Sequence, residues 1–376
     1  MKKLFIILFI GTIGWTILGI PACKQAYTPP AITNPGTYLV IEGFINNGPD
    51  STYFDLTHTF TLSDTAQTTP ELNAKVSIQG TDNSSYPLGE TGNGFYGAPI
   101  SGLNPAIQYR LFIQTSAGKQ YASSYVTLKA SPAIDSVNWT LNSGGTVQLY
   151  VNTHDPQNNT RYYRWNYQET YEYQSAYLAN LQWVNDSIEY LFPDTFYTCW
   201  RQDVSTSILL ATSAQLGQDL IYEYPLVSYP ATSINLSVEY SILVTQYPLT
   251  QDAFSWWQVM QKNTEQIGSI FGVQPTINTG NIRCLSDSNE TVVGYVSGGT
   301  IAKQRIFIAH TQLYPWIYNP DCGERNVPQD SIGDYIKQGM MLVSTASEPG
   351  LYTMSGAICV DCLLLGGTNV KPSFMP

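Results

Sequence analysis

The sequence predicts a mainly β protein: an N-terminal immunoglobulin-like β-sandwich, followed by a larger β-rich domain with one inserted helix. Three observations support this fold class. Aromatic residues make up 13% of the 376 residues, and tyrosine alone accounts for 27. Aromatic and β-branched side chains fit the half-buried surface of a pleated sheet. The chain also contains 29 Gly and 22 Pro, many of them between short apolar runs, as expected for strands joined by turns.

The first 22 residues have the pattern of a secretory signal peptide. Two lysines follow Met1, an apolar run extends over residues 4–20, and Pro21 and Ala22 lead to Cys23. A basic start, an apolar centre and a small residue before the cut are typical of such signals. A cysteine at the cut itself predicts lipidation at Cys23. Pro21 is atypical for a lipobox, so cleavage without lipid is an alternative, and a retained membrane-spanning helix is another.

Composition and turn signals divide the chain into segments. Residues 24–36 are rich in Pro, Thr and Ala, which suits an extended tether. Strand-like runs then alternate with turns until Ser131-Pro132 interrupts the pattern. The predicted segments are a signal peptide (1–22), a lipid-anchored tether (23–36), an immunoglobulin-like β-sandwich (37–130) and a second β-rich domain (131–376).

One helix is predicted in the second domain, near residues 251–267. Thr250 can cap its N-terminus, and Phe254, Trp257 and Met260 recur at helical spacing. Gly268 is a natural end. We interpret this helix as an element that packs against the sheet.

The composition excludes some functions, and the motifs supply no chemistry. A formal net charge of −11 argues against binding of nucleic acid, which requires a basic surface. The sequence has no phosphate-binding loop, nucleophile elbow or zinc-protease helix. We therefore predict no catalytic residue, no cofactor and no metal site. Glycoside hydrolases use a pair of carboxylates whose separation a sequence does not show; Glu169 and Glu172 are the first candidate pair, but edge or surface carboxylates are the interpretation we favour.

An aromatic stretch is the candidate binding region. If exposed, its rings could stack on sugars or hold a peptide, and if buried, they form a sheet core. The candidate binding residues are Tyr162, Tyr163, Trp165, Tyr167, Tyr171 and Tyr173. The adjacent loop at 155–159 has oxygen ligands that calcium could use, although a plain turn is the simpler interpretation.

Cysteines of an exported chain are expected to form disulfides. Five remain besides Cys23: Cys199, Cys284, Cys322, Cys359 and Cys362. Because their number is odd, at least one is unpaired or bonds another molecule. We predict one disulfide between Cys322 and either Cys359 or Cys362, and a second between Cys199 and Cys284. The spacing of Cys359 and Cys362 also suits zinc, although a further pair of ligands is missing.

Several phrases together resemble one family. They lie at residues 38–45, 155–165, 262–266, 280–282 and 359–368. The chain resembles the Bacteroidetes domain-of-unknown-function family 4249 over nearly all of its mature length, with Met375 where an aromatic residue is expected. The resemblance implies an outer-membrane lipoprotein, of a kind often encoded beside TonB-dependent transporters. It implies no catalytic residue.

Three functions follow, in order of preference. The first is a non-catalytic accessory or binding subunit of a TonB-dependent transporter, anchored by lipid to the outer membrane of the cell envelope, on either face. The second is a stand-alone surface module that binds glycans or peptides. The third is a hydrolase.

Overall fold

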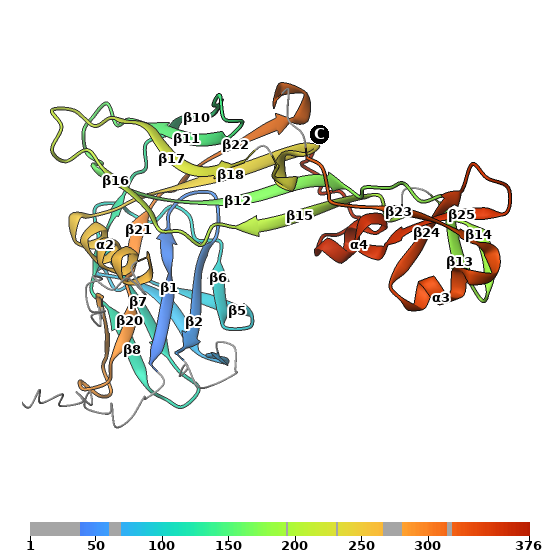
Figure 1. Cartoon of the computed structure of the whole chain (residues 1–376). Coiled ribbons are helices and arrows are strands. Elements are labelled where there is room, and N and C mark those ends of the chain that lie inside the picture. Colours follow the sequence, from blue (N-terminus) through green and yellow to red (C-terminus); the bar gives the residue numbers. More distant parts are fainter. Residues whose placement is uncertain (1–37, 60–68, 193–194, 231, 266–279, 314–317) are drawn as a thin grey trace, which may run out of the picture. The chain divides into compact units, whose positions relative to one another are not determined.

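The computed structural model describes residues 38–59, 69–192, 195–230, 232–265, 280–313 and 318–376 (Figure 1). These residues belong to one compact unit. The predicted signal peptide, the tether and Cys23 lie outside them. Within the described residues, no helix has the length and apolarity needed to cross a membrane. Strands dominate the described chain, and the prediction of a mainly β protein is confirmed.

The strands between residues 39 and 129, together with three later strands, form a sheet that encloses a core. This sheet contains β1 (Leu39–Asn46), β2 (Thr52–His58), β3 (Thr69–Pro70), β4 (Lys75–Gly80), β5 (Ser85–Gly92), β6 (Phe95–Ala98), β7 (Gln108–Gln114), β8 (Gln120–Ser123), β9 (Val126–Lys129), β19 (Ile282–Cys284), β20 (Val292–Gly294) and β21 (Ser297–Gly299). Because β9 pairs with both β21 and β7, the path of paired strands closes on itself. Alternate side chains of each strand point inward, and residues such as Phe54, Leu56 and Leu111 are fully buried there.

Three strands of this sheet come from beyond the predicted boundary at residue 130. β20 and β21 run parallel to β1, and β19 pairs antiparallel with β8. The close approach of β20 to β1 requires glycine: a Cβ at Gly294 would lie 2.2 Å from the Ile41 carbonyl oxygen. The sheet that holds the predicted sandwich of 37–130 therefore includes residues 282–299 as well.

Two further sheets pack face to face over a second core. One contains β12 (Tyr162–Gln174), β15 (Thr198–Val204), β16 (Leu209–Thr212), β18 (Glu239–Pro248) and β22 (Ala302–Ala309), and the other β10 (Ile134–Leu141), β11 (Val147–Thr153) and β17 (Ile221–Tyr229). Val147, Leu149 and Val151 of β11 share one cluster with Ile242 and Val244 of β18. Figure 1 shows β12, the longest of these strands, between β15 and β18.

The predicted helix is present as α2 (Gln251–Glu265). Its N-terminus is capped as expected, because Thr250 Oγ1 accepts a hydrogen bond from the Ala253 N–H at 3.2 Å. Phe254 is buried, and so is Trp256, which the helical spacing did not single out. The predicted end at residue 267 lies outside the described residues.

A third packing region joins a hairpin to the C-terminal part of the chain. It contains β13 (Leu181–Val184), β14 (Ser187–Tyr190), β23 (Glu324–Pro328), α3 (Ile332–Lys337), β24 (Met340–Thr345), β25 (Leu351–Gly356) and α4 (Ala357–Val360). Short 3-10 helices lie at Ile234–Leu236, His310–Leu313, Gln329–Ser331 and Cys362–Leu365. Leu181 of the hairpin packs with Val327, Ile332 and Met354. The helices α3 and α4 were not predicted, because neither is long enough to show a period.

The two disulfides confirm one predicted pairing and correct the other. Cys322 bonds Cys359, which is one of the two partners predicted for it. Cys199 bonds Cys362, so the predicted bond between Cys199 and Cys284 is wrong. Cys284 is a buried free thiol of β19. It belongs to the first core, whereas Cys199 and Cys362 belong to the second.

Candidate functional site

The candidate binding aromatics do not form an exposed surface. Five of them (Tyr163, Trp165, Tyr167, Tyr171 and Tyr173) are at most 9% exposed. They occupy alternate positions of β12 and point into the second core. Tyr162 is partly buried, with its ring 5.2 Å from that of Phe254. These rings therefore do not form the exposed binding face that was predicted: Trp165 stacks on Tyr224 of β17 at 4.9 Å, and the Tyr173 hydroxyl donates a hydrogen bond to the Cys362 carbonyl oxygen.

The side chains of Glu169 and Glu172 do not point toward a common site. Residues three apart in a regular strand point to opposite faces of a sheet, and β12 pairs with β18 without a register shift across both positions. Glu169 lies in the core and accepts hydrogen bonds from the hydroxyls of Tyr229 and Tyr240. Burial raises the pKa of Glu169, although both hydroxyls oppose that shift. The Glu172 carboxylate accepts a hydrogen bond from Trp200 Nε1 on the other face.

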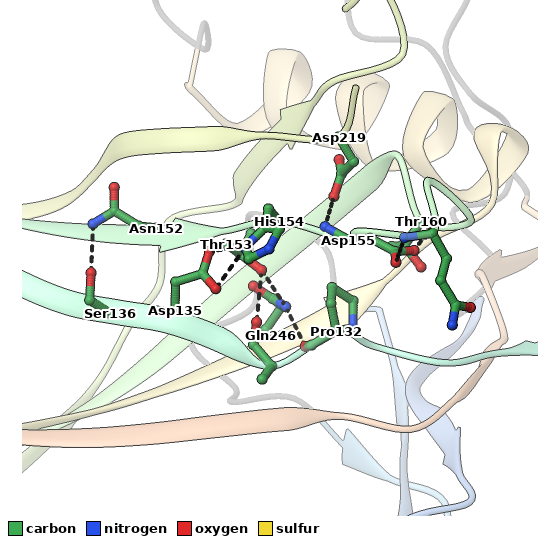
Figure 2. A network of polar contacts seen from close by, with 12 residues as sticks. Pro132, Asp135, Ser136, Asn152, Thr153, His154, Asp155, Thr160, Asp219 and Gln246 are labelled. Carbon is green, nitrogen blue, oxygen red and sulfur yellow. Dashed lines mark hydrogen bonds and ion pairs between the residues drawn. The ribbon is translucent and has the colours of Figure 1, made fainter. Parts of the chain in front are cut away.

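The loop at residues 155–159 is a turn whose carboxylate is occupied by backbone groups (Figure 2). Asp155 accepts hydrogen bonds from the N–H groups of Gln157, Asn159 and Thr160, each at 2.9 Å. Burial raises the pKa of Asp155, but the three backbone N–H groups outweigh it and lower the pKa. Over the part of the chain that the structure describes, no group of three or more metal-ligating side chains gathers.

Two buried polar side chains hold this region together. Asp219 Oδ2 accepts hydrogen bonds from the Asp155 N–H at 2.6 Å and from the Tyr163 hydroxyl at 2.5 Å. The Gln246 amide donates to the Pro132 carbonyl oxygen at 3.0 Å and to Thr153 Oγ1 at 3.2 Å. Figure 2 shows both clusters beside the start of β10 and the end of β11. Because these bonds are internal and satisfied, we interpret them as structural.

An open pocket lies on the opposite, polar face of β12. It has a volume of about 630 Å³ and is lined by side chains of β12, β18 and β22 together with β1, β2 and the turn between them. Its polar and charged lining residues include Glu42, Asp50, Arg164, Asn166, Gln168 and Lys303. The size is within the range of pockets that bind small molecules. It is the candidate functional site.

Arg164 is the distinctive side chain of this pocket. Its guanidinium carbon lies 4.5 Å from the ring centre of Tyr247 and 4.1 Å from that of Trp257 in α2. Its Nε–H is buried without a hydrogen-bond partner. Burial lowers the pKa of Arg164, and the nearby Tyr247 and Glu42 oppose that shift. No carboxylate of the described chain forms an ion pair with this guanidinium.

The rim of the pocket is held by contacts between the two sheets. Lys303 of β22 forms an ion pair with Asp50, whose side chain lies in the turn after β1, at 3.0 Å. The rings of Phe44 in β1 and Tyr247 in β18 meet edge to face at 5.3 Å. Both walls are therefore fixed by direct contacts.

Sequence reasoning missed this site because it followed the aromatic positions of β12 and not those between them. Arg164, Asn166 and Gln168 alternate with the aromatic residues and form the polar face. A buried strand with a polar face of three consecutive alternate positions is a signal that could have pointed to a pocket. The contributions of Glu42 and Lys303, which lie far away in sequence, carried no such signal.

Comparison with known proteins places the chain in a family. A family model described as "Domain of unknown function (DUF4249)" matches residues 24–305. The chain belongs to this family. The description of the DUF4249 family assigns no activity, and no curated protein matches the chain. Among solved structures, the two fibronectin type-III domain segment from chicken tenascin matches 57% of this chain and 93% of its own length, at 10% identity and a TM-score of 0.16.

Proposed function

We propose that this DUF4249 protein is a non-catalytic binding subunit that is tethered to the outer membrane by lipid on Cys23 and acts beside a TonB-dependent transporter. The observation that carries the binding role is the pocket around Arg164. It combines an open volume, aromatic rings and a guanidinium that forms no ion pair with a carboxylate of the described chain. Concave sites with few, well-placed polar groups are typical of ligand binding.

The placement of the buried carboxylates supports a non-catalytic role. Glu169 and Asp219 are buried, and each accepts hydrogen bonds from groups of the chain itself. A general acid or base must reach a substrate proton, directly or through one water. Carboxylates enclosed by their own donors have no such access.

The position at which the family match begins supports the proposed lipid tether at Cys23. The matched region begins at residue 24, directly after Cys23, which agrees with cleavage before that cysteine. Fully extended, residues 23–36 would reach at most about 50 Å. A lipid on Cys23 would therefore keep the pocket close to a membrane partner.

Co-purification tests this proposal. The full chain would be isolated from its native envelope in mild detergent, with the mature N-terminus examined by mass spectrometry. We expect an acylated Cys23 and a TonB-dependent transporter in the same complex. A Cys23→Ser variant provides the matched control, because it removes the lipid and leaves the pocket unchanged. An unacylated N-terminus, or recovery of the lipoprotein without any transporter, would overturn the proposal.

A further inference from the structure

We propose that the pocket binds a ligand carboxylate on the guanidinium of Arg164. This inference rests on the proposed binding role and names the chemistry of the ligand. It concerns the polar face of β12, whose side chains alternate with the candidate aromatics; of these aromatics, Tyr167 also lines the pocket.

The guanidinium of Arg164 is a buried charge that lacks a carboxylate partner in the described chain. A guanidinium has five N–H donors and no acceptor, and a buried charge is costly unless it is paired and hydrogen-bonded. Here the Nε–H is buried without a partner, and the charge is stabilised by two aromatic rings. Cation–π contacts use the charge but not the N–H donors. The described residues therefore leave at least the Nε–H donor without an acceptor.

The arrangement of the N–H donors on the Arg164 guanidinium favours a carboxylate as the ligand group. Arginine presents a planar fork that matches a carboxylate through two parallel hydrogen bonds. The other cation of the pocket, Lys303, is already paired with Asp50. Arg164 is therefore the cation of the pocket that the described residues leave without a carboxylate partner.

The carboxylates in and beside the pocket further restrict the chemical class of ligand that it can bind. Glu42 lines the pocket and lies opposite Asp55 in the β1–β2 ladder. Burial and the charge of Glu42 raise the pKa of Asp55, whose Oδ1 is buried without a partner. Close carboxylates repel a polyanion and accept hydrogen bonds from ammonium or hydroxyl groups. The fitting ligand thus has a single carboxylate with hydrogen-bond donors next to it.

Two sources share this chemistry, a peptide C-terminus and a uronic acid sugar, and the experiment separates them. Calorimetry on the full chain in detergent would compare a tripeptide with its C-terminal amide, and galacturonic acid with galactose. We expect at least one carboxylate form to bind roughly tenfold or more tightly than its neutral analogue. Equal affinity within both pairs, or no binding in either, would overturn the inference.

Two variants assign the effect to Arg164. In Arg164→Met the preference for the carboxylate should disappear. Arg305→Met is the matched control: Arg305 lies 3.8 Å from the ring centre of Phe374 and does not line the pocket, so the preference should remain. Retention of the preference in Arg164→Met would place the carboxylate elsewhere. If Arg164→Met fails to fold, the comparison of each acid with its neutral analogue on the native chain still tests whether the pocket prefers a carboxylate.

The inference and the proposed function can fail separately. Co-purification with a transporter does not depend on the carboxylate preference. A complex that forms normally but shows no such preference would overturn the assignment of the ligand alone.

Discussion

Cys199 in β15 is bonded to Cys362 across 163 residues of sequence, with their Cα atoms 5.8 Å apart. Cys362 begins a 3-10 helix that follows α4, and the second disulfide joins Cys359 in α4 to Cys322. The first bond attaches the segment after α4 to the sheet of β12 and β15, and the second joins α4 to the residues just before β23. The free Cys284 takes no part in this connection.

Loss of the long-range disulfide should lower stability substantially. We expect Cys362→Ala to reduce the free energy of unfolding by roughly 2–5 kcal/mol, because the disulfide restricts the unfolded chain. Chemical unfolding without reductant would measure this. Cys284→Ala is the matched control and should cost about 1 kcal/mol or less, since it removes only a small buried side chain. A peptide map with Cys199 bonded to Cys284 would contradict the assignment.

Glu169 should make stability depend on pH. Burial raises its pKa above the ordinary value of 4.5, so the folded chain keeps a proton that the unfolded chain releases. The free energy of unfolding therefore falls as pH rises between the two pKa values. Glu169→Gln lacks this contribution. The stability of the native chain relative to this variant should decrease from about pH 5 to about pH 8, by about 1.4 kcal/mol for each tenfold difference in proton affinity.

Urea unfolding at both pH values would test this prediction. Glu172→Gln is the control at the other face of β12, where the side chain is only partly buried. We expect it to change stability by less than about 1 kcal/mol. A pH-independent difference between the native chain and Glu169→Gln would show that the burial of Glu169 does not control its proton.

The alternation of β12 was predictable from sequence, but its orientation was not. Aromatic residues at 163, 165, 167, 171 and 173 define one face, and a period of two residues implies a strand. Whether that face is exposed depends on what covers it. Its cover comes from distant segments, among them β17 over Trp165 and the 3-10 helix at Cys362–Leu365 beside Tyr173, which the local pattern of β12 cannot reveal. The inference that these rings bind a ligand failed for that reason.

The topology beyond residue 280 was not predictable either. β19, β20 and β21 have three residues each, too few to show a period. Ile282 pairs with Ser123, 159 residues away (282 − 123), and Val292 with Leu39, 253 residues away (292 − 39). The same separation misled the assignment of Cys284, which moves with β19 into the first core. By contrast, α2 was predicted from its cap and apolar spacing, because both are local.

Asp219 should be essential to the turn at residues 155–159. It is 3% exposed and accepts hydrogen bonds from the Asp155 N–H and from the hydroxyls of Tyr163 and Ser213. Asp219→Asn keeps the size but replaces an acceptor by a donor, so a buried donor loses its partner. We expect a loss of about 2–3 kcal/mol. Asp334→Asn, in an exposed pair with Lys337, should cost less than about 1 kcal/mol in the same thermal unfolding assay. Equal costs would contradict a structural role for Asp219.

Arg164 should behave in the opposite way, because the role that we propose for it is binding and not stability. Replacing a buried charge that lacks a partner by an apolar side chain of similar length removes a desolvation cost. The two lost cation–π contacts are worth about 1–2 kcal/mol each at a buried site, and methionine recovers part of that through its own contacts with rings. We therefore expect Arg164→Met to leave the free energy of unfolding within about 1 kcal/mol of the native chain, or to raise it. A loss of about 3 kcal/mol or more, matched by Glu42→Gln in the same unfolding assay, would instead indicate that these two residues form a structural ion pair in solution.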